Sequence, residues 1–99
     1  MPALLVNFRL SKPTTDPDYA KIIGVIKQYS YSMLGEGAVA IATNESPAMV
    51  FTKFKPYLGE RDILLITSLN KPHYGLHKPS VIQWIEENAS SSTATGNGE

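Results

Sequence analysis

Ala3–Leu10, with the sequence ALLVNFRL, is the stretch that decides the fold of this chain of 99 residues. Successive side chains of a strand point to opposite faces. One face of this stretch would carry a row of large apolar residues, which are Leu4, Val6, Phe8 and Leu10. The other would carry Leu5, Asn7 and Arg9. The alternation predicts a strand that packs one face on a core and turns Arg9 away from that core.

Two later segments carry the same signal for the start of a helix. Asp16 stands before Pro17, and Ser46 stands before Pro47. A short polar side chain caps the free N–H groups of a helix, and proline suits the first helical position because it has no N–H to leave unpaired. We therefore expect a helix to begin at each proline, and the second helix to be cut short or kinked by Pro56.

Three further strands are expected. Tyr31–Leu34 and Ala38–Thr43 flank the sequence Gly-Glu-Gly, which allows the positive backbone angles of a tight hairpin. Asp62–Leu69 is the most strand-like run in the chain, because four large aliphatic residues follow one another in it. A continuous apolar run of this kind predicts a strand that is covered on both faces.

The order of these elements predicts the fold class. Strand, helix, strand, strand, helix, strand is the split βαβ arrangement, so we expect an α+β protein with a ferredoxin-like βαββαβ sandwich and an additional C-terminal helix over Ser80–Asn88. Two helices would cover one face of a four-stranded antiparallel sheet. The other face stays open unless the last helix or a second copy covers it, and its apolar side chains predict a homodimer.

The chain divides into one domain over residues 1–88 and a polar tail over residues 89–99. The tail is made of alanine, serine, threonine, glycine and asparagine with a single charged residue. It buries too little apolar surface to offset the entropy of ordering it. We therefore expect the tail to be disordered.

Composition excludes several classes of function. Nine basic and nine acidic residues cancel, so no field of the whole molecule draws the chain to nucleic acid or to a membrane. The lack of cysteine excludes disulfides, thiolate metal sites and a cysteine nucleophile. No apolar run approaches the ~20 residues that cross a bilayer, and the N-terminus lacks the apolar core of a secretory signal. We expect a cytoplasmic protein with no cofactor and no membrane partner.

Five short segments together resemble a known group of proteins. They span about residues 3–88 in one register and read LSKP at Leu10–Pro13, DPDY at Asp16–Tyr19, DILL at Asp62–Leu65, YGL at Tyr74–Leu76 and WIEEN at Trp84–Asn88. This set resembles the short bacterial proteins called SinR-like, in the ferredoxin-like group of Cas-two and VapD proteins. The resemblance implies a homodimer built through the sheets. Proteins of that group usually act on nucleic acid.

Arg9 departs from the pattern of the group. In its nuclease members an aspartate at the end of the first strand, repeated across the dimer axis, gathers a divalent metal. A hard cation needs carboxylate oxygens, whereas a guanidinium offers only hydrogen-bond donors. The tryptophans usual around the hairpin are also replaced, by Tyr31 and Ala38. We therefore expect no metal site, no catalytic residue of the family type and no metal-dependent nuclease activity.

Four residues are candidates for contact with nucleic acid. Arg9, Lys12 and Lys71 carry positive charge for phosphate groups, and Tyr74 offers a ring on which an exposed base can stack. Lys12 and Lys71 each follow one of two neighbouring antiparallel strands, which places them at opposite edges of the sheet. The expected arrangement therefore disperses the charge.

Three functions stay open from the sequence. The leading hypothesis is a homodimeric binding or regulatory module in a mobile-element or toxin-antitoxin setting. A ribonuclease toxin of the VapD type would use His73, His77 or Tyr74 as acid or base without a metal. A component of a larger assembly would contribute a sheet edge and contact only protein. His73 and His77 stand four residues apart, but the glycine and prolines around them predict a surface loop rather than a metal site.

Overall fold

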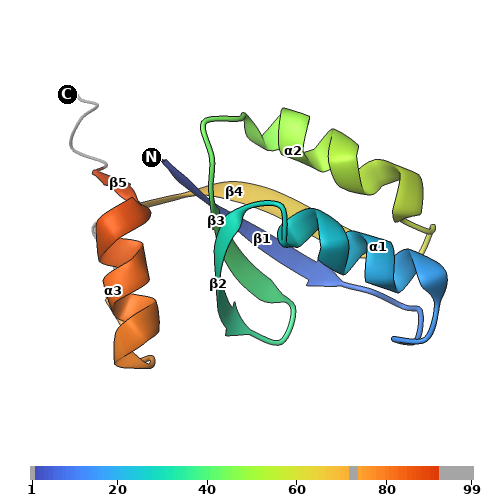
Figure 1. Cartoon of the computed structure of the whole chain (residues 1–99), viewed down its shortest axis with the longest axis horizontal. Coiled ribbons are helices and arrows are strands. Elements are labelled where there is room, and N and C mark those ends of the chain that lie inside the picture. The colour runs from blue at the N-terminus through green and yellow to red at the C-terminus, as the bar shows by residue number, and fades with distance from the viewer. Residues whose placement is uncertain (1, 72–73, 92–99) are drawn as a thin grey trace.

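The structure of the chain is a computed structural model that describes residues 2–71 and 74–91 (Figure 1). It contains three α-helices, a short 3₁₀ helix and a sheet. In chain order the elements are β1 (Ala3–Arg9), α1 (Pro17–Ile26), β2 (Ser30–Gly35), β3 (Ala38–Ala42), α2 (Pro47–Phe54), η1 (Lys55–Tyr57), β4 (Ile63–Lys71), α3 (Pro79–Asn88) and β5 (Ser90–Ser91). The expectation of an α+β chain is confirmed.

The sheet has the strand order β2-β3-β1-β4-β5. Its first four strands pair antiparallel, and β5 adds only two residues, which run parallel to the end of β4. Strand order and connectivity are compatible with a ferredoxin-like fold. Because β1 lies between β3 and β4, the strand with the clearest alternation is central to the sheet.

Both helix starts follow their sequence signals. The Asp16 carboxylate accepts a hydrogen bond of 2.8 Å from the N–H of Asp18, and the Ser46 hydroxyl accepts one of 3.2 Å from the N–H of Met49. The second helix ends at Phe54, two residues before Pro56, and continues as the 3₁₀ turn η1. Its expected shortening is confirmed.

The hairpin between β2 and β3 turns at Gly37, whose φ is +76°. A Cβ atom there would lie closer to the carbonyl oxygen of Phe8 than Cβ atoms lie to such an oxygen in real proteins. The N–H of Phe8 donates a hydrogen bond of 2.8 Å to the Gly37 carbonyl. The turn therefore needs glycine for its backbone angle and for its contact with β1.

The first face of the sheet is covered by α1 and α2 and contains the main core. Its buried residues come from two central strands and both helices: Leu4, Val6, Ile22, Val25, Ile26, Val39, Ile41, Val50 and Phe54. They include Leu4 and Val6 of the predicted apolar row, and the partly buried Phe8 and Leu10 pack against them, so the predicted orientation of that strand is confirmed. Phe54 has no exposed surface and is the largest fully buried side chain.

The second face is covered only in part, by α3, which lies apart from α1 and α2 in Figure 1. Val81, Ile85 and Ala89 pack with Leu34 of β2 and Leu69 of β4. Leu34 is at the hairpin end of the sheet, whereas Leu69 lies opposite Ala3, the first residue of β1. The helix therefore crosses this face on a diagonal and leaves one corner bare.

Two expectations need correction. The prediction that Asp62–Leu69 is covered on both faces is wrong for the single chain, because Ile63 is 57% and Leu65 60% exposed. The folded part also extends past residue 88, since Ala89 is buried and Ser90–Ser91 form β5. Residues 92–99 of the expected tail lie outside the described residues.

Candidate functional site

The bare part of the second face forms a continuous surface, called here the open corner. Three cross-strand pairs of β1 and β4 compose it: Leu5 with Thr67, Asn7 with Leu65, and Arg9 with Ile63. Every member except the half-buried Leu5 is exposed. The open corner thus presents three aliphatic side chains interspersed with the polar Asn7 and Thr67, and the Arg9 guanidinium lies at its rim.

The open corner continues around the outer edge of β4. Within the described residues, β4 pairs with β1 along one side and with β5 only at Asn70 and Lys71 on the other. The outer edge over Ile63–Leu69, called here the free edge, has no described strand beside it. Its outward backbone groups are available to a further strand.

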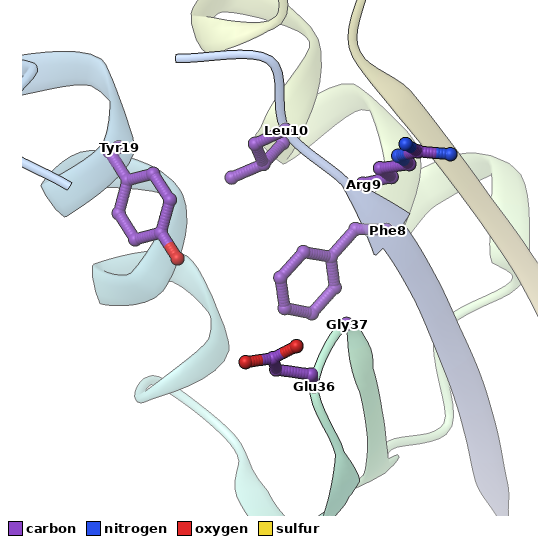
Figure 2. Close-up of a pocket in the computed structure, with 6 residues that line it drawn as sticks. All are labelled: Phe8, Arg9, Leu10, Tyr19, Glu36 and Gly37. Carbon is purple, nitrogen blue, oxygen red and sulfur yellow. The ribbon is translucent and has the colours of Figure 1, made fainter. Parts of the chain in front are cut away.

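Arg9 stands at the mouth of a hollow of about 380 Å³ at the end of β1 (Figure 2). Figure 2 shows the Phe8 ring, Tyr19 and Glu36 on one side of β1 and the Arg9 side chain pointing away from them. No ion pair of Arg9 occurs among the described residues. Its charge is therefore presented to solvent on the face that carries the open corner, as the alternation of β1 predicts.

Lys12, a predicted contact for nucleic acid, is instead part of a buried polar lock. Its ammonium donates to the Asp62 carboxylate at 2.7 Å and to the Tyr57 carbonyl at 2.6 Å. The same carboxylate accepts from the N–H of Gly59 at 2.7 Å and from the N–H and hydroxyl of Ser11 at 2.8 and 3.1 Å. The lock ties the segment after β1 to η1 and to the start of β4.

The Asp62 side chain has no exposed surface. Burial by itself raises the pKa of this carboxyl, but the hydrogen bonds from Lys12, Gly59 and Ser11 outweigh it and hold the pKa well below its usual range. All of these partners are donors to the ionised form. Asp62 is therefore a fixed structural anion rather than an acid, a base or a free metal ligand.

The remaining two predicted contacts lie far from Arg9. Lys71 is eight residues along β4 from Ile63, the partner of Arg9, a separation of roughly 27 Å along the strand. Its ammonium lies 3.7 Å from Glu86 of α3. Tyr74 is fully exposed beyond β4. The structure does not gather Arg9, Lys12, Lys71 and Tyr74 into one site, and the expected dispersal of the two lysines is confirmed.

His77 has both ring nitrogens in use. Its Nδ1 accepts a hydrogen bond of 2.8 Å from the N–H of Lys78, so its Nε2 is left to donate to the Leu34 carbonyl. The imidazole thereby fastens the segment before α3 to β2. Its companion in the metal and ribonuclease hypotheses, His73, lies outside the described residues.

A second polar cluster was not predicted from the sequence. The Tyr29 hydroxyl donates to Glu45 at 2.7 Å, and the Lys53 ammonium donates to Glu45 at 2.9 Å and to the Tyr29 oxygen at 2.9 Å. Burial raises the pKa of the Tyr29 phenol, while the hydrogen bonds from Tyr29 and Lys53 lower the pKa of Glu45. The cluster joins the connection between α1 and β2 to α2 and to the loop before it. No signal at short sequence spacing could reveal it.

The part of the chain that the structure describes contains no group of side chains that could bind a metal ion. Over residues 2–71 and 74–91, no three His, Asp or Glu side chains stand close enough to hold an ion. Over the same residues no helix is long and apolar enough to span a bilayer. The distinctive surfaces are therefore the open corner and the free edge.

No protein-family model, no curated protein and no solved structure matches this chain. The geometry of the chain itself must therefore support any assignment of function.

Proposed function

We propose that the chain is a homodimeric binding module of the SinR-like, Cas-two and VapD-related ferredoxin-like group, and that it has no metal-dependent nuclease activity. The observation that carries the proposal is the open corner. Ile63 and Leu65 are more than half exposed on β4, at the corner of the second face that α3 does not cover. Large aliphatic side chains gathered and exposed on one surface typically mark an interface.

The balanced charge of the chain is compatible with a second copy as the partner. The chain has no net charge, so two copies approach each other without long-range repulsion. The open corner holds a single charged group, Arg9, at its rim, and polar rims around apolar centres are the usual anatomy of an interface.

The chemistry at the end of β1 supports the absence of metal-dependent cleavage. Arg9 occupies the position where the nuclease members carry an aspartate, and a guanidinium cannot coordinate a cation. Asp62, which stands one residue before Ile63, the partner of Arg9, uses both of its carboxylate oxygens in the hydrogen bonds of the lock. A hydrolytic metal site would therefore require residues that the described fold does not bring together.

The same geometry favours protein over nucleic acid as the bound partner. Phosphate recognition depends on several cations acting together. Here Lys12 is buried in the lock and Lys71 is at the far end of β4 from Arg9. A ribonuclease mechanism based on His77 is disfavoured as well, because both of its ring nitrogens hold the backbone.

Sedimentation equilibrium of the purified chain tests the dimer. We expect a dimer for the unchanged chain, a monomer for Leu65→Lys, and a dimer for the control Met33→Lys, which alters an equally apolar and half-exposed residue on the opposite edge of the sheet. A chain that stays monomeric at high concentration contradicts the proposal.

Incubation of the purified chain with labelled RNA and DNA in magnesium or manganese tests the proposed absence of metal-dependent nuclease activity. We expect intact nucleic acid, and unchanged electrophoretic mobility at low salt, where phosphate contacts are strongest. Robust cleavage contradicts the absence of nuclease activity. Cleavage that persists in chelator and is lost in His77→Ala would support the ribonuclease toxin instead.

A further inference from the structure

The free edge lacks the features that usually prevent an edge strand from pairing with another strand. Ile63–Leu69 reads ILLITSL and holds no charged residue, no proline and no glycine. Natural sheets usually protect an edge with lysine, proline, a bulge or a very short strand, because bare backbone groups pair with any strand they meet. None of these devices is present along the seven residues.

The surroundings of the free edge are apolar on both faces. On the first face a groove of about 310 Å³ runs between α2 and β4, lined by Pro47, Ala48 and Phe51 with Leu64, Leu65 and Ile66. On the second face lies the open corner. A strand paired with β4 would contact the groove on the first face and the open corner on the second face. Its backbone would hydrogen-bond with the outward N–H and C=O groups of β4.

The described part of the chain does not supply that strand. β5 runs parallel to β4 and pairs Ser90 with Asn70 and Ser91 with Lys71. β5 therefore runs in the same direction as β4 and pairs only at the end of β4 that is far from Ile63. The pairing with β5 also closes the edge at Asn70, which leaves Ile63–Leu69 as the free length.

We propose that the free edge pairs antiparallel with the free edge of a second copy, about a twofold axis at Ile66. This geometry rests on the proposed homodimer and specifies how its two copies meet. A twofold interface must be complementary to itself. An uncharged strand meets this demand, since its antiparallel copy brings no like charges together along these seven residues.

The free length fixes the register. Centring it on the axis places Ile66 opposite Ile66 of the second copy, and it pairs Leu65 with Thr67 and Ile63 with Leu69. Because Leu69 already lies under α3, Ile63 gains a neighbour in a packed cluster. The two open corners join across the axis, so the exposed side chains of both copies receive new cross-strand contacts.

Single cysteines test this register, because the described chain contains no cysteine of its own. Residues directly opposite in an antiparallel pair have Cα atoms about 4.5–5.5 Å apart, within the range of a disulfide. Ile66→Cys should therefore form a covalent dimer under mild oxidation. Ser68→Cys is the matched control, on the same strand and face, and its Cα atoms would be about 14 Å apart.

We expect most of the Ile66→Cys chain to run as a covalent dimer on a non-reducing gel, with only background for Ser68→Cys. A chain that sediments as a dimer without linking at residue 66, or that links equally at both positions, overturns the edge pairing and leaves the proposed homodimer standing. A chain that is monomeric overturns both.

A second variant guards against misfolding of the cysteine variants. Ser68→Lys places a charge on the exposed first-face side of the free edge and leaves the open corner unchanged. Edge pairing predicts a monomer with an unaltered circular dichroism spectrum. A dimer as stable as that of the unchanged chain means that the copies meet through the open corner alone, which overturns the inference.

Discussion

The two faces of the sheet are built from the same strands but lie in different surroundings. On the first face, α1 and α2 enclose Val6, Ile41 and Phe54 without exposed surface. On the second face, α3 crosses on a diagonal, and Ile63 and Leu65 stay more than half exposed. The difference indicates that the first face is completed by the chain itself, whereas the second requires something further.

The largest expected effect comes from breaking the completed face. Phe54→Ala removes the largest fully buried side chain and should lower the free energy of unfolding by about 4 kcal/mol. Ile63→Ala on the second face should lower it by less than about 0.5 kcal/mol at concentrations too low for pairing. Urea denaturation measures both. Similar losses would contradict the difference between the faces.

The hairpin gives the next largest effect, because its turn touches β1 at the border of the two faces. Gly37→Ala adds a Cβ into the Phe8 carbonyl at a positive φ and should cost about 2–3 kcal/mol. Gly35→Ala is the control, since its Cβ would meet nothing within 4 Å. Thermal unfolding followed by circular dichroism compares the two. Equal melting temperatures would show that Gly37 is not constrained as described.

The lock gives a smaller, pH-dependent effect. Lys12→Met removes one donor from the Asp62 carboxylate and should cost about 2 kcal/mol at neutral pH. Because the folded pKa of Asp62 is depressed, its contribution is present above the unfolded pKa of about 4 and is lost as the pH falls through the folded value.

In Lys12→Met the folded pKa of Asp62 moves back toward its unfolded value. The free energy of unfolding should therefore fall less steeply with decreasing pH in this variant than in the unchanged chain. Urea midpoints between neutral and acid pH measure this slope. Lys53→Met is a useful comparison, since it removes a lysine from the separate Tyr29 cluster. Identical slopes in Lys12→Met and the unchanged chain would mean that Asp62 does not depend on Lys12.

Local patterns predicted most of the fold. The alternation of β1, the Asp16-Pro17 and Ser46-Pro47 starts and the glycine turn each depend on residues close together in the sequence, and each is found in the structure. The covering of β4 could not be predicted in this way. Its aliphatic run indicates two apolar faces, but a pattern cannot say whether the cover belongs to the same chain.

The candidate site was predicted only in part for a related reason. Arg9 was placed correctly on the outward face because strand alternation is local. Lys12 resembles a solvated lysine in the sequence, and its buried partner Asp62 stands fifty residues further along the chain. The antiparallel pairing of β1 with β4, which places Arg9 opposite Ile63, brings the two segments together. Contacts of that range follow from the tertiary fold.

Amide hydrogen exchange at several protein concentrations tests the central claim, that a second copy covers what the single chain leaves bare. We predict that the protection of amides in Ile63–Leu69 rises with concentration, while that of β3, already paired on both sides, stays constant. Protection of Ile63–Leu69 that is the same at the lowest and highest concentrations would contradict the account.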